Sequence, residues 1–293
     1  MNNNTNQAVL FGADNQTTIG IVGLGVMGAS FGARLRQAGY RVLGFDLTDQ
    51  IIMTARELQV IDDGTIHPEE MLGQCDVLIF CLYPEAIASY LQKYGKELKD
   101  GVLVMEISGV KSSVVPAIEA SLPDTARFVS IHPMCGRESK GIAYSSPAIF
   151  LDANFLIIET PKTTEQDMQE AHTMARQLGC RRISRLSMEE HDTMIAFLSQ
   201  LTHVIAVSLM NTHENSHLVE FTGDSFRDLT RIAKINEEMW SELFVLNKPL
   251  LLEEIRQFED SLDTFKQALE AEDKETMKAL FIQSTERRKK FDR

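Results

Sequence analysis

Short apolar runs rich in β-branched residues recur along the first two thirds of the chain, and amphipathic stretches separate them. This alternation is typical of βαβ units, so it predicts a mainly parallel sheet covered by helices. The predicted strands are Thr18–Val22, Arg41–Asp46, Val77–Cys81, Val102–Ile107, Arg127–Ile131, Phe155–Glu159 and Arg182–Arg185.

The pattern changes near residue 187, after which the chain is predicted to be almost wholly helical. Ser187 and Glu190 have the spacing of a capping box, which marks a helix start. An apolar periodic run continues from there to Met210. Two further helical regions are expected: Glu237–Phe258 with an interruption at Pro249, and Ser261 to about Lys289.

A glycine-rich turn, GLGVMG over residues 23–28, follows the first predicted strand and opens a helix. In such a turn, Gly23 permits the tight bend, Gly25 lets a pyrophosphate approach the backbone, and Gly28 lets the helix pack on the strand. The free N–H groups of the first helical turn, at Val26 and Met27, favour an anion. The spacing therefore predicts dinucleotide binding; the alternative is a glycine-rich turn of some other α/β domain.

The second predicted strand ends in Asp46. A carboxylate there can accept hydrogen bonds from the adenosine ribose hydroxyls and repel a 2′-phosphate. No arginine immediately follows it, which favours NAD over NADP. We expect the α/β fold class, with a Rossmann-type dinucleotide-binding domain at residues 18–186, an all-α domain at 187–293, and a disordered tail at 1–17.

Composition narrows the class of protein. The 293 residues are 44% hydrophobic, which is ordinary for a globular protein and leaves room for about two domains. The net charge of −13 disfavours nucleic acid as a partner and requires local cations for any anionic substrate. We expect no membrane-spanning run and no signal peptide. The four cysteines lack Cys-x-x-Cys spacing, so a reduced, cytoplasmic protein is the simpler interpretation.

Three groups of residues are candidates for chemistry. His132 and Glu138 lie in IHPMCGRE (131–138), a segment expected to be a loop after a strand, where a neutral imidazole can take a proton. Asp228 and Arg231 lie three apart in FRDLTRI (226–232), where the arginine can bind a substrate carboxylate. His203 lies within an apolar helical run. The alternatives are a structural loop histidine, a solvated ion pair and a core histidine, respectively.

One further motif suggests a different activity. His213-Glu214-Asn215-Ser216-His217 matches the HExxH pattern of zinc proteases, with Glu237 as a distant third ligand. The flanking residues are typical of a helix that is ending, and the longer zinc-protease signature is absent. We therefore expect no metal site.

Together these segments resemble the prephenate/arogenate dehydrogenase family of tyrosine biosynthesis. The resemblance rests on GLGVMG with Asp46, IHPMCGRE, EEHD (189–192) followed by His203, FRDLTRIA (226–233), and the segment from Met239-Trp240 to Asn247. It runs from about Thr18 to beyond Asn247 and implies a Rossmann domain joined to a helical domain that forms a homodimer interface.

The resemblance implies NAD(P)-dependent oxidative decarboxylation, which converts prephenate to 4-hydroxyphenylpyruvate or arogenate to tyrosine. It makes His132 the catalytic histidine and assigns a small dicarboxylate as substrate. His203 and Arg231 match substrate-contacting residues, and Glu138 and Asp228 match acids that position or gate the arginine. The expected partners are this substrate and a second copy of the chain, bound through the C-terminal helices.

The chain departs from the family pattern beside the catalytic histidine. Where Ser-Val-Lys is usual, it has Ser108-Gly109-Val110-Lys111, so Gly109 replaces the serine that assists the histidine. Ser108 can take that part only if the loop is shifted. Neither a chorismate mutase domain before Thr18 nor an ACT domain after the last helix is expected.

Two other functions remain open at this stage. One is a β-hydroxyacid dehydrogenase or imine reductase, which would be expected to carry a catalytic lysine between Met188 and Met210, where none is found. The other is a dinucleotide-sensing protein without turnover.

Overall fold

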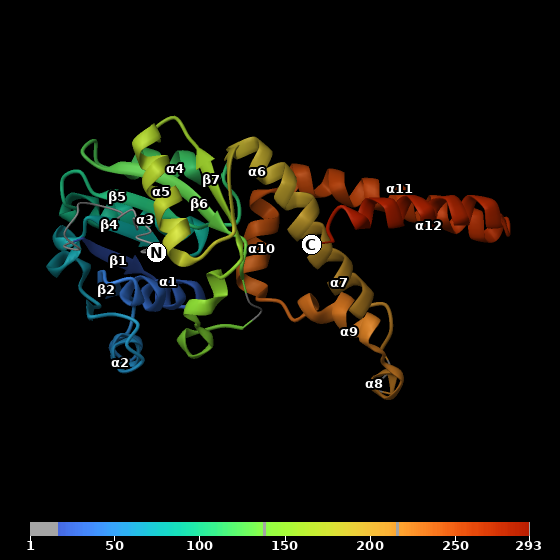
Figure 1. The fold of residues 1–293 in the computed structure, drawn as a ribbon, viewed down its shortest axis with the longest axis horizontal. Coiled ribbons are helices and arrows are strands. Elements are labelled where there is room, and N and C mark those ends of the chain that lie inside the picture. The colour runs from blue at the N-terminus through green and yellow to red at the C-terminus, as the bar shows by residue number, and fades with distance from the viewer. Residues whose placement is uncertain (1–16, 137–138, 215–216, 293) are drawn as a thin grey trace, which may run out of the picture.

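The computed structural model describes residues 17–136, 139–214 and 217–292. Figure 1 shows an α/β part formed by the N-terminal half, joined to an elongated helical part that ends in two long helices. The predicted fold class is confirmed: a Rossmann-type domain is followed by a helical domain.

The described part of the first domain contains one eight-stranded sheet in the order β3-β2-β1-β4-β5-β6-β7-β8. All neighbouring strands are parallel except β6 and β7. The strand order reverses between β1 and β4, and such a point is where open α/β sheets bind ligands at their carboxyl ends. The strands are β1 (Thr18–Val22), β2 (Arg41–Phe45), β3 (Asp63–Thr65), β4 (Val77–Phe80), β5 (Leu103–Glu106), β6 (Arg127–Pro133), β7 (Asn154–Glu159) and β8 (Arg182–Ser187).

Two details differ from the sequence-based expectation. The short strand β3, Asp-Gly-Thr, was missed because it lacks an apolar run and is held only by pairing with β2. His132 was expected in a loop, but β6 continues through Pro133 because the strand pairs with β7, His132 lying opposite Leu156.

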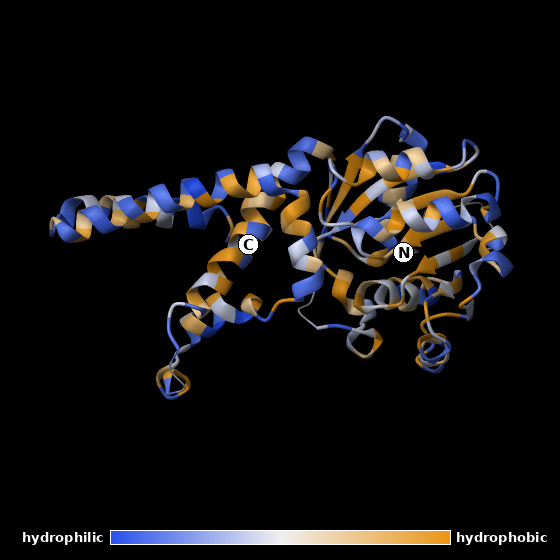
Figure 2. Cartoon of the chain, turned by 180° about the vertical axis from the view of Figure 1, so that it is seen from behind, coloured by the Kyte–Doolittle hydropathy of each residue, from blue (hydrophilic) through white to orange (hydrophobic). Residues whose placement is uncertain are grey.

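Helices cover both faces of the sheet, which explains why its central strands, such as β1 and β4, are apolar and buried along their whole length. On β4, Val77 and Ile79 contribute to the core under one face, and Leu78 and Phe80 to the core under the other. Figure 2 shows the hydrophobic residues concentrated on these strands. The first face carries α1 (Val26–Gln37), α2 (Asp49–Glu57) and α5 (Glu165–Leu178), and the second carries α3 (Pro84–Tyr94) and α4 (Val115–Ser121).

The helical domain is built around one long rod that begins where the sheet ends. Ser187 closes β8 and caps α6 through the expected capping box with Glu190. We infer that the two domains meet at this residue. The rod consists of α6 (Met188–Ile195), a π-helical segment η6 (Ala196–Leu201) and α7 (Thr202–Met210).

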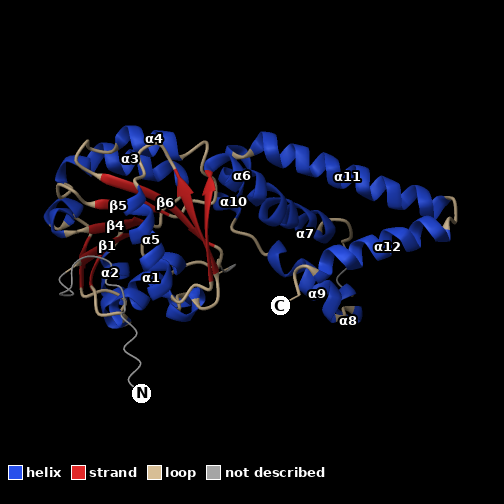
Figure 3. Cartoon of the chain, turned by 45° about the horizontal axis from the view of Figure 1, so that its top comes forward, coloured by secondary structure: helices blue, strands red, loops and turns tan. Residues whose placement is uncertain are grey.

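The remaining helices surround or extend from this rod. Figure 3 shows α11 and α12 as a hairpin that projects away from the sheet. The elements are α8 (Leu218–Phe221), α9 (Asp224–Thr230), α10 (Glu237–Leu246), α11 (Lys248–Glu270) and α12 (Lys274–Lys289). Short 3-10 turns occupy Pro68–Glu70, Leu72–Gln74, Gly95–Glu97, Ile142–Tyr144, Pro147–Phe150 and Arg231–Ala233 (η7).

Of the two predicted breaks in the C-terminal helices, the first is confirmed within two residues and the second is wrong. α10 ends at Leu246 and α11 begins at Lys248, so Pro249 lies in the first turn of the new helix, where no backbone donor is needed. The second break falls at residues 271–273 rather than near residue 259, and the Asp273 side chain caps α12. The hairpin projects from the domain, so no core imposes an apolar pattern that would mark its turn.

The rod corrects the expectation that no stretch of the chain is long and apolar enough to span a membrane. Met188–Met210 is long and apolar enough by composition to cross a membrane, although only 28% of that stretch is buried within the chain. In the structure it serves as the central helix of the second domain. Its His191, Asp192 and Gln200 side chains are buried and hydrogen-bonded, as expected for a helix packed against protein.

Candidate active site

The glycine turn after β1 has the geometry that close approach of an anion requires. Gly23 has φ +90°, and a Cβ there would lie 2.7 Å from the carbonyl oxygen of Cys81. A Cβ on Gly28 would lie 1.8 Å from the carbonyl oxygen of Gly23, so only glycine lets α1 pack this closely. A Cβ on Gly25 would meet nothing within 4 Å. The open side of the turn is therefore at Gly25, where a pyrophosphate would be expected.

The surroundings of this opening fit a dinucleotide. Gly25 precedes α1 and provides no side-chain cap, so the first-turn N–H groups at Val26 and Met27 face the opening without a capping side chain. Asp46 follows β2, and its carboxylate accepts the N–H groups of Leu24 and Leu47, both at 2.7 Å. Each carboxylate oxygen retains a lone pair for a ribose hydroxyl. The residues present thus fit NAD.

His132 lies near the carboxyl end of β6 and is joined to the helical domain by a chain of side chains. Its Nδ1 is 2.8 Å from Nε2 of His191. Nδ1 of His191 is in turn 2.8 Å from Oδ1 of Asp192. His191 and Asp192 are buried residues of α6, whereas His132 is partly exposed. The described contacts therefore place one histidine at the site and an imidazole–carboxylate pair behind it.

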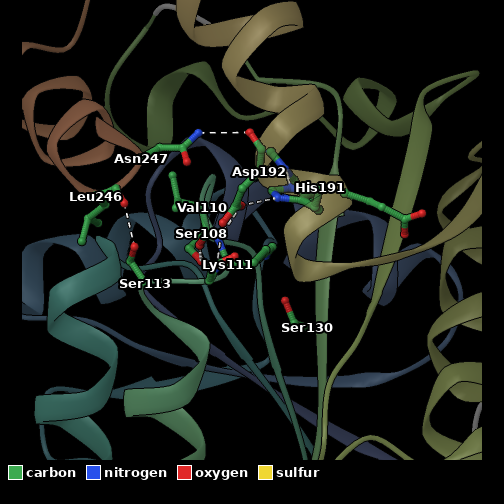
Figure 4. Close-up of polar contacts among 12 residues, drawn as sticks. Ser108, Val110, Lys111, Ser113, Ser130, His191, Asp192, Leu246 and Asn247 are labelled. Atoms are coloured by element: carbon green, nitrogen blue, oxygen red, sulfur yellow. Dashed lines mark hydrogen bonds and ion pairs between the residues drawn. The ribbon is translucent and has the colours of Figure 1, made fainter. Parts of the chain in front are cut away.

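Asp192 is fixed by contacts from both domains (Figure 4). Its carboxylate accepts the backbone N–H of Lys111 at 2.8 Å and that of Ser112 at 2.7 Å, both in the loop between β5 and α4. Its backbone carbonyl accepts Nδ2 of Asn247 at 3.1 Å, and the same amide donates to Oε1 of Gln200 at 2.8 Å. These bonds position α6 against the end of the sheet.

A buried ion pair lies beneath His132. Lys111 and Glu106 are both fully buried, and Lys111 Nζ is 2.8 Å from Oε1 of Glu106. The same ammonium donates to the backbone carbonyl of Ile131 at 2.8 Å, next to the histidine. The hydroxyls of Ser108 and Ser130 also hydrogen-bond the Glu106 carboxylate. A buried charge pair is tolerated when further hydrogen bonds satisfy its groups, and here the ammonium has a second acceptor and both carboxylate oxygens accept a hydroxyl.

Burial and neighbouring charges keep both imidazoles neutral. Burial, the cationic form of His191 and the Lys111 ammonium lower the pKa of His132 well below its usual value. Burial also lowers the pKa of His191, although the hydrogen bond to Asp192 opposes the shift. Burial alone would raise the pKa of Asp192, but bonds from His191, Ser112 and Lys111 hold it below its ordinary value. The site thus contains an ionised carboxylate and an unprotonated base near neutral pH.

Ser108 and Gly109 show what the departure from the family pattern does. The Ser108 hydroxyl has one proton and lies within hydrogen-bonding distance of two acceptors, the Glu106 carboxylate and the carbonyl oxygen of Val110, the latter at 3.0 Å. A Cβ on Gly109 would lie 3.3 Å from both methyl carbons of Leu243, so this glycine faces α10 at close range. In the structure Ser108 binds the buried carboxylate under His132. A catalytic role for Ser108 stays a prediction.

His203 lies at the start of α7, on the helical side of the site. Its Nδ1 is 2.8 Å from the carbonyl oxygen of Ser199, and its ring stacks on Trp240 of α10 with centroids 3.7 Å apart. Gln200, one turn earlier in the π-helical segment, donates to the carbonyl of Leu243 at 3.1 Å. π-Helical segments often occur at functional sites. This one joins α6 to α7 along the chain, and its Gln200 side chain holds it against α10.

Arg231, predicted to bind a substrate carboxylate, and Asp228, predicted to position it, are on the surface of the helical domain. Asp228 is exposed in α9, and Arg231 is exposed at the start of η7, a segment that packs on α7. The two therefore span the end of a helix rather than one regular helical face. Glu138 lies outside the described residues. The convergence of Arg231 with His132 around one ligand stays a prediction.

The zinc-protease pattern does not lie on one helix. α7 ends at Met210, so His213 follows it in an irregular segment, and His217 precedes α8. The histidines of such a motif must share a helical face to bind one ion. No group of three or more His, Cys, Asp or Glu side chains placed to bind a metal occurs in residues 17–136, 139–214 and 217–292.

Sequence reasoning missed the residues behind His132. The motifs contain His191, Asp192 and Lys111, but the sequence pattern assigns these three residues no role. Glu106 lies inside the predicted strand Val102–Ile107, with no sign that its side chain belongs to the site. A usable signal was present: a histidine and an aspartate in an otherwise apolar helix, and a lysine directly after a predicted strand. Buried polar residues of this kind need partners, and here they find one another.

Comparison with known proteins identifies relatives over both domains. The family model described as prephenate dehydrogenase, nucleotide-binding domain, matches residues 31–184. The model described as prephenate dehydrogenase, dimerization domain, matches residues 187–283. Two structures of 3-hydroxyisobutyrate dehydrogenase also superpose, with TM-scores of 0.51 and 0.55 at 16% and 17% identity, which shows a shared fold alone. Because both domains match models of prephenate dehydrogenase, this reading is favoured over the β-hydroxyacid dehydrogenase alternative.

Individual relatives agree with these matches. Prephenate dehydrogenase of Bacillus subtilis is 26% identical over 89% of this chain and 72% of its own length. Cyclohexadienyl dehydrogenase of Zymomonas mobilis is 26% identical over 92% of this chain and 94% of its own. The structure of A. aeolicus prephenate dehydrogenase with hydroxyphenyl propionate and NAD+ superposes with a TM-score of 0.86 at 27% identity, covering 94% of this chain and 99% of that one.

Two alanine substitutions in the glycine turn are expected to separate binding from folding. Gly28→Ala forces a Cβ against the Gly23 carbonyl, so it should lower the free energy of unfolding by about 1–3 kcal/mol. Gly25→Ala adds a methyl group in open space at φ −70°, so the melting temperature should be unchanged while NAD affinity falls. Thermal melts and calorimetric titration with NAD measure the pair. Full NAD affinity in a folded Gly25→Ala protein would contradict this site.

The histidine pair should titrate abnormally. Both imidazoles are expected to stay neutral below the usual histidine pKa of about 6.5. Unfolding returns them to that value, so the unfolded chain binds more protons and stability falls as the pH drops below about 6.5. Nuclear magnetic resonance (NMR) titration of ¹⁵N-histidine-labelled protein measures the pKa values. An ordinary pKa at both rings would show that the pair is not buried as described.

Proposed function

Because the chain belongs to the prephenate dehydrogenase family, we propose that it oxidises and decarboxylates prephenate or arogenate with NAD. The product is 4-hydroxyphenylpyruvate or tyrosine, respectively. Apart from family membership, one observation supports this assignment. His132 is a neutral imidazole near the carboxyl end of β6, and an ionised carboxylate lies behind it. The activity belongs to tyrosine biosynthesis.

In this reaction the carbinol C–H and O–H bonds break, as does the bond from the ring to its carboxylate. NAD, when bound, accepts the hydride. His132 takes the hydroxyl proton as the carbonyl character develops, and the ring carboxylate leaves as CO2. The electron pair of the broken C–C bond moves through the ring to the carbonyl oxygen, which takes the proton back from His132 as the phenol forms. Aromatisation of the ring supplies the driving force, so the chain's task is to orient the substrate and to hold one proton during the reaction.

The substrate has two carboxylates and the chain carries a net charge of −13, so binding needs local cations. Arg231 is proposed to bind a substrate carboxylate, with Asp228 and Glu138 positioning or gating its guanidinium. His203 is proposed to contact the substrate from α7, its ring held by Ser199 and Trp240. These groups lie on the helical domain or the loop after β6, whereas the base lies on the sheet.

Asp46 supports NAD as the cofactor. Its carboxylate is fixed by two backbone N–H groups at the end of β2. A fixed negative charge there accepts hydrogen bonds from the 2′-hydroxyl of NAD and repels the 2′-phosphate of NADP.

The helical domain supports a homodimer, which is proposed to be cytoplasmic. Large apolar side chains are exposed on several of its helices, and such side chains mark a protein–protein contact where they are contiguous. The dimerization-domain model covers the same region. The side chains include Phe197, Leu198, Val219, Phe221, Leu229, Leu262, Leu269, Phe281 and Ile282.

The reduced-cofactor absorbance band tests the function. We expect NADH to form when NAD is offered with prephenate or with arogenate, with one CO2 released per NADH. NADP should support a slower reaction. NAD binding without NADH formation from either substrate would favour a dinucleotide-sensing protein and contradict the proposal.

Replacement of the base should reduce turnover and leave cofactor binding intact. His132→Asn retains a side chain that can hydrogen-bond but cannot accept the proton, so kcat should fall by about 10²–10⁴-fold. NAD affinity, measured by calorimetry, should be the same as in the wild type. A variant as active as the wild type would remove His132 from the mechanism.

Loss of the guanidinium should act on substrate binding. Arg231→Gln is expected to raise the KM for the substrate about 10- to 100-fold, since a hydrogen bond to a charged group contributes about 1.5–3 kcal/mol. Arg227→Gln, on exposed α9 in the same region, is the matched control and should leave KM unchanged. Equal KM values for the two variants would count against the carboxylate anchor.

A further inference from the structure

We propose that His191 and Asp192 are positioning residues that fix the tautomer of His132, so that its Nε2 atom carries the lone pair offered to the substrate hydroxyl. This inference deepens the proposed function and rests on it. The geometry that carries it is the unbroken series of contacts from Asp192 Oδ1 to His191 and from His191 Nε2 to His132 Nδ1, each 2.8 Å long.

The direction of each hydrogen bond follows from the carboxylate. An ionised carboxylate can only accept, so the proton between Asp192 and His191 belongs to Nδ1 of His191. A neutral imidazole has one N–H, which leaves Nε2 of His191 as an acceptor. That acceptor takes the proton on Nδ1 of His132. Nε2 of His132 is then unprotonated and able to act as the base.

The donor and acceptor roles along these hydrogen bonds cannot easily be exchanged, because the Asp192 carboxylate at one end is needed as an acceptor. Oδ1 and Oδ2 of Asp192 accept the N–H groups of Lys111 and Ser112, so both oxygens are needed as acceptors. These bonds also keep the carboxylate ionised despite its burial. The His191 ring is fully buried, which leaves little space for it to turn over.

The same arrangement stabilises the charge that develops during the reaction. When His132 takes the substrate proton it becomes a cation, and its Nδ1–H donates to His191, which is hydrogen-bonded to the Asp192 anion. The other charged groups nearby, Lys111 and Glu106, form an ion pair and largely offset each other. Asp192 is therefore the uncompensated charge behind the base. This division of roles resembles that of a serine-protease triad, where a carboxylate sets the histidine tautomer.

The tautomer is measurable without turnover. In ¹⁵N-histidine-labelled protein, long-range ¹H–¹⁵N spectra distinguish a protonated ring nitrogen from an unprotonated one, and His132→Asn identifies the His132 signals. We expect His132 in the Nδ1–H form in the wild type. His191→Phe keeps a ring of similar shape but removes the acceptor, so the Nε2–H form should become populated. The wild-type protein with His132 in the Nε2–H form would overturn the proposal, whether or not the chain oxidises prephenate.

Kinetics test the consequence for the reaction. His191→Phe should lower kcat with prephenate and NAD by about 10- to 100-fold, the effect seen when partners that orient a metal-bound histidine are removed. KM for the substrate and NAD affinity should change little. His191→Gln should recover most of the lost kcat, because its amide can donate to Asp192 and accept from His132 at once. His67→Asn, on an exposed loop histidine, is the control for loss of an imidazole and should match the wild type.

A structural role alone predicts a different result. If His191 only filled space, the shape-matched His191→Phe would retain wild-type kcat, and His191→Gln would be the weaker enzyme; either outcome overturns the proposal. If His191→Phe does not fold, as shown by loss of NAD binding, His191→Gln and the wild-type tautomer decide the question. A wild-type chain with the Nδ1–H tautomer but no activity on either substrate would reject the proposed function and leave the tautomer assignment standing.

Discussion

The carboxylate of Asp192 is the point on which the candidate site depends. It accepts two backbone N–H groups from the loop after β5 and one side-chain donor from its own helix, while its backbone carbonyl binds Asn247. One group therefore joins three segments that are distant in the sequence. Because both of its oxygens are occupied by donors, it stays ionised and immobile, and the two domains meet at a fixed distance beside His132.

This constraint explains how the work is divided between the domains. The sheet provides the glycine turn, Asp46 and the histidine near the end of β6, all near the carboxyl ends of parallel strands. The helical rod provides the groups that orient this histidine and also His203, two residues after its π-helical segment. The buried Lys111–Glu106 pair adds little net charge, and its ammonium holds the carbonyl of Ile131 beside His132. The backbone N–H of Lys111 connects this part of the sheet domain to Asp192 of the rod. The two domains thus share the site: the sheet provides the neutral base, and the rod provides the groups that orient it.

Local patterns were enough to predict the α/β half and the cofactor turn. Strand, glycines, helix and Asp46 follow one another within residues 18–46, so their spacing determines their geometry. The groups behind His132 could not be predicted in this way, because Lys111 and Asp192 are 81 residues apart and meet only through tertiary packing. The turn between α11 and α12 was misplaced for a related reason: the hairpin extends beyond the core, and no buried face marks where it ends. The roles of Asp228 on α9, Arg231 on η7 and Glu138 remain predictions, because each depends on a bound substrate.

A crystal structure of the chain with NAD and 3-(4-hydroxyphenyl)propionate would test the central claim most directly, because this ligand places a hydroxyl at one end and a carboxylate at the other. The account predicts the hydroxyl oxygen within about 2.6–3.2 Å of Nε2 of His132, with the series to Asp192 intact behind it. A hydroxyl bound elsewhere, with Nε2 of His132 turned away from the ligand and the nicotinamide, would contradict it.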